Sequence, residues 1–151
     1  MKKIKVTKGK YVLVDNTDFN ELSKYKWHTD LRSIARYIKG SNNKRIKIHR
    51  QIMNCPKGME VDHKDGNIFN NQRKNLRICT HAENGKNQKK PKNNTSGYKG
   101  VSWYKKLNKW AAKIKVNYKG KHLGYFDTKE EAYKAYCKAC IKYHGEFANL
   151  G

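Results

Sequence analysis

The chain has 151 residues, and its 35 Lys and Arg outnumber its 12 Asp and Glu, so the formal net charge is +23. No apolar run approaches the ~18 residues of a membrane-spanning helix, and the first residues lack the apolar segment of a secretory signal. We therefore expect neither an integral membrane protein nor a secreted one. The 3 Trp, 10 Tyr and 4 Phe are enough for packed cores, and an aromatic, strongly basic chain is typical of polyanion binding.

The positive charge is spread along the whole chain. Residues 1–50 carry a net +10, residues 51–90 a net +4 and residues 91–151 a net +9. This excess is larger than solubility requires. It favours a protein that contacts nucleic acid over most of its length.

The first 54 residues read as a β-rich, DNA-contacting segment. Residues 11–14 form a β-prone run, and residues 36–39 and 45–49 flank a Gly-Ser-Asn-Asn turn typical of a hairpin. Alternation along the second strand of that hairpin predicts that His49 lies on a cationic face.

Residues 55–88 predict a compact unit with the order strand, loop, strand, helix. Strands are expected at residues 60–63 and 75–79, with a turn directly after the first. Thr80 and Glu83 match a capping box, which predicts a short helix that carries Asn84 and Asn87.

This unit concentrates side chains suited to phosphodiester hydrolysis. Asp62 offers a carboxylate oxygen and Asn84 an amide oxygen, a sparse set of hard ligands of the kind that Mg²⁺ uses. His63 can accept a proton near neutral pH, and the side-chain carbonyl of Asn75 can hold the proton on its other ring nitrogen. Neighbours in a regular strand face opposite ways, so we expect the strand to break up where Asp62 and His63 converge.

The residues of this unit resemble the HNH motif of phage and intron-encoded homing endonucleases. His63 precedes Asn75 by twelve residues, and Asn75 precedes Asn84 by nine, as in that motif. The resemblance implies a metal-dependent DNA endonuclease of the ββα-metal fold, with His63 as general base and Asn75 as orienting residue. It implies Asp62 and Asn84 as ligands of Mg²⁺, with Mn²⁺ as a substitute, although the position of Asn84 is often His. It also implies that His49 and Arg50 support the phosphate or the active site.

The four cysteines do not form a paired zinc motif. Cys137 and Cys140 are closely spaced, and His144 lies one turn beyond them, but a fourth ligand is not evident. We expect free thiols, no structural zinc and a reducing setting, namely the cytoplasm of a bacterial or phage-infected cell.

A polar linker over residues 89–96 precedes a second domain over residues 97–151. Residues 97–104, 109–116 and 121–126 predict three antiparallel strands, and a second capping box begins a helix that runs to about residue 143. Alternation predicts that Trp110, Ala112 and Ile114 point toward that helix. Lys113 and Lys115 then point outward.

This C-terminal segment resembles the Apetala-two/ethylene-response-factor DNA-binding domain, in runs such as Gly97-Tyr98-Lys99-Gly100-Val101. The resemblance implies that the sheet lies in the DNA major groove, with the helix behind it. The DNA-facing positions that follow are Lys99, Ser102, Tyr104, Lys113, Lys115 and His122. Residues 91–151 contain thirteen Lys and no Arg, which predicts strong, salt-sensitive binding with loose sequence choice.

The sequence thus predicts an α+β protein that is a magnesium-dependent DNA endonuclease with its own DNA-binding domain. Its partner would be double-stranded DNA, with no membrane and no obligate protein partner. One alternative is a non-catalytic DNA-binding protein or regulator with a relic nuclease fold. Another is a basic RNA-binding protein whose sheet aromatics stack on bases.

Overall fold

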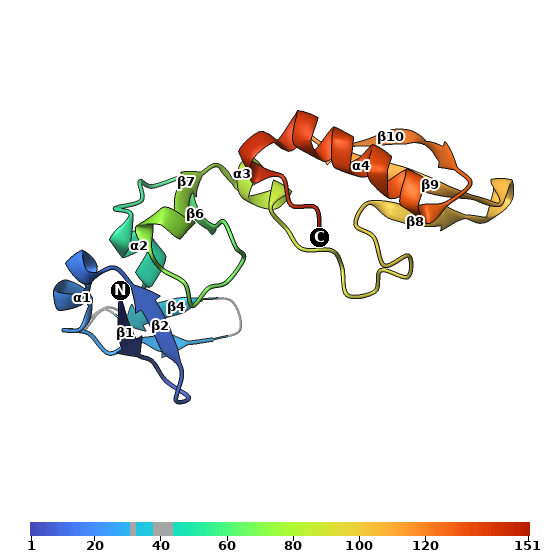
Figure 1. Ribbon diagram of the computed structural model, residues 1–151. Coiled ribbons are helices and arrows are strands. Elements are labelled where there is room, and N and C mark those ends of the chain that lie inside the picture. The colour runs from blue at the N-terminus through green and yellow to red at the C-terminus, as the bar shows by residue number, and fades with distance from the viewer. Residues whose placement is uncertain (31–32, 38–43) are drawn as a thin grey trace. The chain divides into compact units, whose positions relative to one another are not determined.

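The computed structural model describes residues 1–30, 33–37 and 44–151, and it has the expected α+β class. The chain divides into two compact units, residues Met1–His81 and Ala82–Gly151 (Figure 1). The boundary between them falls at the first residue of a short helix, α3 (His81–Lys86).

The first unit combines short helices with three small antiparallel sheets. Two of the sheets are the β1–β2 hairpin and the β6–β7 ribbon, and the third has the order β3-β4-β5. The elements are β1 (Lys2–Lys5), β2 (Tyr11–Val14), α1 (Asn16–Leu22), β3 (His28–Thr29), β4 (Ile34–Tyr37), β5 (Arg45–Lys47), α2 (Ile48–Ile52), β6 (Glu60–His63), the 3₁₀ turn η1 (Arg73–Asn75) and β7 (Leu76–Cys79).

The predicted hairpin of residues 36–49 is confirmed in its pairing but not in its length. β4 and β5 pair antiparallel, whereas the turn predicted between them lies outside the described residues. β5 ends at Lys47, and the next five residues form α2, so the prediction of His49 on a strand is wrong. Helical spacing brings Ile48 and Ile52 to one face, where both are buried, and this burial outweighs strand alternation.

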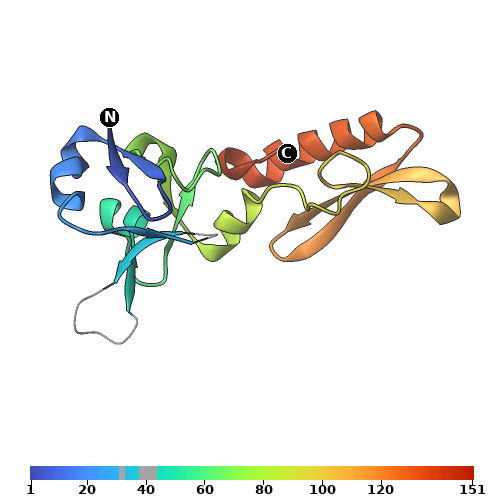
Figure 2. The ribbon, with the colours of Figure 1, turned by 90° about the horizontal axis from the view of Figure 1, so that it is seen from below.

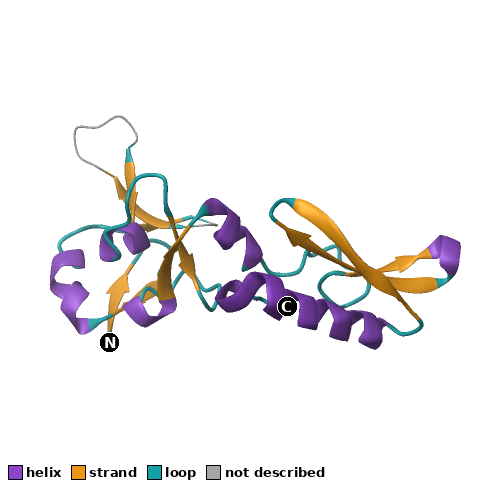
Figure 3. Ribbon diagram, turned by 90° about the horizontal axis from the view of Figure 1, so that it is seen from above, coloured by secondary structure: helices purple, strands orange, loops and turns teal. Residues whose placement is uncertain are grey.

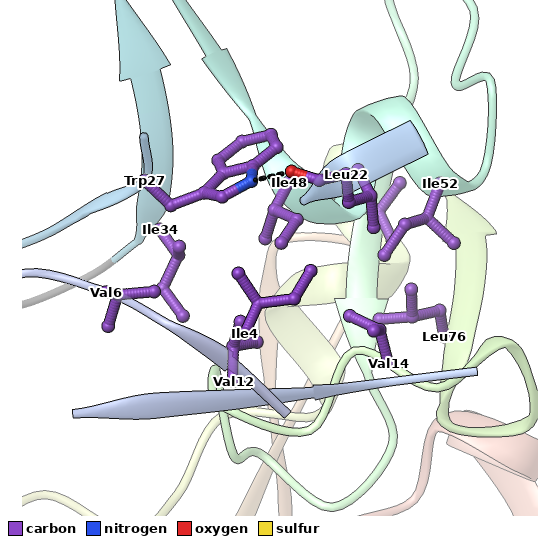
Figure 4. Close-up of a cluster of buried hydrophobic side chains, with 11 residues drawn as sticks. Ile4, Val6, Val12, Val14, Leu22, Trp27, Ile34, Ile48, Ile52 and Leu76 are labelled. Atoms are coloured by element: carbon purple, nitrogen blue, oxygen red, sulfur yellow. Dashed lines mark hydrogen bonds between the residues drawn. The ribbon is translucent and has the colours of Figure 1, made fainter. Parts of the chain in front are cut away.

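One apolar core holds the first unit together (Figure 4). Ile4, Val12 and Val14 of the first hairpin pack in the same cluster as Ile48 of α2 and Leu76 of β7. Inside it, the indole N–H of Trp27 donates to the carbonyl of Leu22 at 2.8 Å. The β6–β7 ribbon is therefore anchored on the N-terminal segment.

The second unit is a three-stranded antiparallel sheet covered on one face by a long helix (Figures 2 and 3). Its elements are α3, which begins one residue before the unit, β8 (Val101–Tyr104), η2 (Lys105–Leu107), β9 (Lys109–Val116), β10 (Lys119–Phe126), α4 (Lys129–His144) and η3 (Gly145–Phe147). The strand order is β10-β9-β8.

The predicted first strand of this sheet is shorter than expected. Residues 97–100 form turns, and the strand begins only at Val101. Gly100 has a φ of +75°, and a Cβ at this position would lie 2.1 Å from the ring of Tyr136. The chain passes so close to α4 here that glycine is required.

The packing of α4 on the sheet follows the predicted alternation. Ala112 and Ile114 are buried against α4, while Lys113 and Lys115 are exposed. The second capping box is confirmed, because the backbone N–H of Glu131 donates to the hydroxyl of Thr128 at 3.2 Å and the reciprocal bond is also present. No helix in the described part of the chain has the length and apolar character needed to cross a bilayer.

Candidate active site and nucleic-acid interface

The β6–β7 ribbon sets the directions of Asp62 and His63. Asp62 lies opposite Arg77 and His63 opposite Leu76, and the next backbone N–H, that of Lys64, still donates to the carbonyl of Asn75 at 2.9 Å. Both residues therefore lie in the regular part of the ribbon, and the predicted turn follows directly after them, at residues 64–65. In a regular strand neighbouring side chains point to opposite faces, so Asp62 and His63 have different surroundings.

His63 is buried against the side chains of His49 and Asn71. Its ring meets that of His49 edge to face, with centroids 5.2 Å apart and an interplanar angle of 88°. Its Nε2 lies 3.2 Å from Oδ1 of Asn71. Because the amide nitrogen of Asn71 donates to the carbonyl of Ile68 at 2.7 Å, the amide oxygen is the atom that faces His63. The Nε2 atom therefore carries the proton, and Nδ1 is the basic nitrogen of the neutral ring.

Asn71 owes its position to the N-terminal hairpin. Its side chain is fully buried, and its backbone N–H donates to the carbonyl of Leu13 at 2.8 Å. The backbone N–H of Leu13 in turn donates to the carbonyl of Phe69 at 2.8 Å. Leu13 of β2 therefore holds the chain on both sides of Asn70. Asn71 was not among the site residues predicted from the sequence. The one signal that could have identified it is its place between His63 and Asn75 in the HNH-like run.

Asn75 fixes the loop, and its side chain bonds to the loop instead of making the expected bond to His63. Its amide oxygen accepts from the backbone N–H of Asp65 at 3.2 Å, and its amide nitrogen donates to the Asp65 carboxylate at 3.0 Å and the Asn70 carbonyl at 2.8 Å. Burial alone would raise the pKa of Asp65, but the bonds from Asn67, Asn75 and Asn70 lower it overall. An ionised Asp65 thus anchors the turn that follows His63.

Burial sets the charge state of both histidines. Burial, together with the positive charge of the neighbouring His63, Lys47 and Arg50, lowers the pKa of His49 to about 3. Burial also lowers the pKa of His63, although the bond to Asn71 and the nearby acidic groups act in the opposite direction. At neutral pH both rings are therefore uncharged, and His63 is in the form that can accept a proton.

Asp62 is held by a buried ion pair. Its Oδ2 accepts from Nε of Arg77 at 2.9 Å and from Nη2 at 2.7 Å, and the two side chains are only 8% and 10% exposed. Because the two residues are cross-strand partners, the register of the ribbon imposes this contact.

The two predicted metal ligands, Asp62 and Asn84, belong to different units. Asn84 lies on α3 as predicted, in the second unit, whereas Asp62 belongs to the first. Across residues 1–30, 33–37 and 44–151 there is no cluster of three or more His, Cys, Asp or Glu that could hold a metal. One carboxylate and one amide fit Mg²⁺, which keeps several waters and binds phosphate oxygens.

Arg50, which was expected to support the phosphate or the active site, makes its hydrogen bonds to the loop before β6. Its guanidinium donates to the backbone carbonyls of Met59, Cys55 and Pro56, the last two at 3.2 and 2.9 Å. These bonds fasten the loop before β6 to α2.

The outer sheet face, defined as the face of β8–β10 turned away from α4, carries most of the predicted DNA-facing residues. Ser102, Lys113, Lys115 and His122 are exposed there. Tyr104 lies against Tyr125, with ring centroids 5.0 Å apart, and the ring of His122 lies 4.4 Å from that of Tyr125. The face thus combines ammonium groups with an aromatic cluster, which suits a polyanion that also presents flat bases or sugars.

Lys99 does not belong to that face. Its ammonium donates to the carbonyl of Asn149 at 2.8 Å and to that of Gln88, and burial lowers its pKa. The chain turns before β8 begins, and this turn directs Lys99 inward within the second unit.

The cysteines are free thiols, as expected. Cys140 lies 3.6 Å from Nδ1 of His144, and Nε2 of that ring donates to the carbonyl of Lys115 at 2.9 Å. His144 therefore ties the end of α4 to the sheet.

Two families match separate parts of the chain, the HNH endonuclease family over residues 54–86 and the AP2 domain over residues 96–146. Protein 3.8 of Escherichia phage T7 is 39% identical over 95 residues, which cover 63% of this chain and 78% of that protein. APETALA2-like protein 2 of Oryza sativa subsp. indica is 35% identical over 65 residues, or 43% of this chain and 15% of the rice protein. The AP2-like ethylene-responsive transcription factor TOE2 of Arabidopsis thaliana is 34% identical over 65 residues, or 43% of this chain and 13% of the plant factor. No solved structure matches the chain.

Proposed function

We propose that this chain, which belongs to the family of phage T7 protein 3.8, is a metal-dependent endonuclease of duplex DNA. The chain carries an HNH endonuclease domain and an AP2 domain. The observation that carries the proposal is the state of His63, a buried neutral histidine whose Nε2 proton is held by Asn71. Such a ring has its basic nitrogen ready at neutral pH.

In this proposal His63 takes a proton from the water that attacks the phosphorus. Asn71 keeps the Nε2 proton in place, so that only Nδ1 can act as the base. The ring of His49 restricts the tilt of the His63 ring from the side. Asn75 and Asp65 act one step further away, because they hold the turn on which the His63 strand ends.

Asp62 and Asn84 would hold the divalent cation, for which we propose Mg²⁺ with Mn²⁺ as a substitute. When bound, the cation neutralises charge on the phosphate and on the leaving oxygen. Arg77 restricts the rotation of the Asp62 carboxylate through two hydrogen bonds to one oxygen.

The AP2 domain would deliver the nuclease to duplex DNA through the outer sheet face. Lys113 and Lys115 would contact phosphates, and Ser102, Tyr104 and His122 would lie along the groove. Residues 91–151 contain no Arg, the residue that binds guanine through two hydrogen bonds. This supports binding that depends more on the DNA phosphates than on base recognition. We place this activity in the cytoplasm of a bacterial or phage-infected cell.

The test is incubation of supercoiled plasmid with the purified protein and Mg²⁺, beside lanes with EDTA and with His63→Ala. We expect open-circle or linear DNA only in the wild-type lane with Mg²⁺. Genomic DNA digested in parallel, with Mn²⁺ as a second cation, covers a target that the plasmid lacks. No cleavage of either substrate would refute the proposed activity.

A second candidate is a DNA-binding protein that does not cut. One observation favours it, because Arg77 already neutralises the carboxylate that would bind the cation. Tight, salt-sensitive shifts of duplex DNA without any cleavage would support this candidate, and preference for single-stranded RNA over duplex DNA would point away from both.

A further inference from the structure

The C-terminal tail of the second unit is fastened to the segment that follows α3 (Figure 1). The amide nitrogen of Asn149 donates to the backbone carbonyl of Asn87 at 2.9 Å and to its side-chain oxygen at 3.1 Å. Lys99 donates to the carbonyls of Asn149 and Gln88. We call these four residues the tail clamp.

The tail is itself held firmly on α4. The phenol of Tyr133 donates to the carbonyl of Leu150 at 3.3 Å, and the thiol of Cys140 lies 3.8 Å from the carbonyl of Asn149. The side-chain oxygen of Asn149 accepts from the backbone N–H of Gly151 at 3.0 Å, which fixes the direction in which its amide nitrogen points. The tail clamp is therefore an extension of the AP2 fold.

The tail clamp contacts the residues that directly follow a short helix. α3 has six residues, and none of them is buried. A helix this short has little stability of its own, since nucleation is costly and few hydrogen bonds follow it. Its C-terminal end is defined by the backbone N–H of Asn87, which donates to the carbonyl of Asn84 at 3.3 Å. Asn87, which is buried, thus joins Asn84 directly to Asn149.

Three of the four tail-clamp residues lie outside the segments that the two families describe, and Lys99 lies inside the AP2 match. The HNH match ends at residue 86 and the AP2 match covers residues 96–146, so Asn87, Gln88 and Asn149 belong to neither. The HNH motif is also divided between the units, with Asp62 and His63 in residues 1–81 and Asn84 in residues 82–151.

From these contacts we infer that Asn149 is a positioning residue for Asn84. Through the tail clamp it attaches α3, the helix of the proposed metal ligand, to the DNA-binding fold. The position of Asn84 is then fixed relative to the sheet that binds DNA. The inference rests on the proposed nuclease function. It makes the last residues of the chain part of the cleavage machinery without any contact to the DNA or the cation.

The experiment compares the full-length wild-type protein with Asn149→Ala and with the matched control Asn93→Ala, an exposed asparagine of the linker. Hydrogen exchange is followed over residues 84–88, DNA affinity is measured in EDTA, and single-turnover cleavage is measured over a series of Mg²⁺ concentrations. For Asn149→Ala we expect exchange at residues 84–88 to rise about tenfold, because the variant lacks two hydrogen bonds that the wild type makes. We expect unchanged DNA affinity.

Cleavage by the saturated Asn149→Ala complex should be about tenfold slower or more, with a higher Mg²⁺ midpoint and partial recovery at high Mg²⁺. A merely structural role would not move the Mg²⁺ midpoint. If Asn149→Ala does not fold, Lys99→Met removes the other link of the tail clamp, with Lys138→Met on the exposed side of α4 as its control.

The failures of the two proposals can be told apart. A wild-type protein that binds DNA and never cuts refutes the nuclease and, with it, the catalytic role of Asn149. Wild-type cleavage with an Mg²⁺ midpoint that Asn149→Ala leaves unchanged overturns the inference alone. Unchanged exchange at residues 84–88 overturns it whether or not the protein cuts.

Discussion

Replacing Asn71 with Ala should damage stability and cleavage together. The side chain is fully buried, and its removal leaves the carbonyl of Ile68 and the Nε2 proton of His63 without the partners they now have at 2.7 and 3.2 Å. A buried polar group that loses its partner costs about 1–3 kcal/mol, so the two together give about 2–6 kcal/mol. For a chain of this size each kcal/mol lowers the melting temperature by about 2–4 °C.

The effect on cleavage follows from the tautomer of His63. Without Asn71 the ring can carry its proton on either nitrogen and can turn, so only part of the population has Nδ1 ready as a base. A positioned base contributes about 10²–10⁴ in rate, and we expect Asn71→Ala to lose about 10–100-fold at a temperature where it is folded. His63→Ala should lose the whole contribution of the general base to the cleavage rate.

Asn70→Ala is the matched control. Asn70 is the adjacent residue and donates to Asp65 at 2.8 Å, and within the described part of the chain its own buried oxygen has no hydrogen-bond partner. Thermal unfolding and single-turnover cleavage of the three variants are measured side by side. If Asn71→Ala cuts as fast as Asn70→Ala while both are folded, the assignment of Asn71 as the residue that orients His63 is wrong.

Three further predictions concern charge. The pKa of His49 is near 3 in the folded protein and near 6.5 when unfolded, so the unfolded state gains the proton first and stability falls as the pH drops from 6.5 toward 3. The slope should approach about 1.4 kcal/mol per pH unit for this residue, and urea unfolding of His49→Gln should show a flatter profile than the wild type. Arg77→Met removes the partner of a buried carboxylate and should lower the free energy of unfolding by about 3–5 kcal/mol. Adding Asp62→Asn to the same chain should restore most of this loss. If the denaturant midpoint of the double variant equals that of Arg77→Met, the prediction is wrong. Replacing Lys113 and Lys115 together with Met should lower the slope of log affinity against log salt by about 0.9 for each phosphate that the protein no longer neutralises, and an unchanged slope would remove both residues from the interface.

Features that depend on residues a few positions apart could be predicted from the sequence. The strand of residues 109–116 follows from alternation, and the helix after Thr128 follows from its capping box. Both signals are local, because strand alternation and helix caps are set by neighbours in the chain. The candidate site came from a longer pattern, the HNH-like spacing from Asp62 to Asn84.

The partners of the candidate site residues could not be predicted in this way. His49 lies on a helix beside His63 because the core required Ile48 and Ile52 on one face. Asn71 meets His63 because the N-terminal hairpin holds its loop.

By itself, the sequence determined the α+β class, the two family resemblances, the basic character and the residue types that hydrolysis needs. Only the tertiary structure decided that Arg50 and Lys99 bind backbone carbonyls and that Asn149 fastens the end of α3. The physical reason is that a lysine, arginine or asparagine has the same propensity whether its donors meet a phosphate or a buried carbonyl. Which partner it meets depends on where distant segments pack, and that is settled by burial of the core.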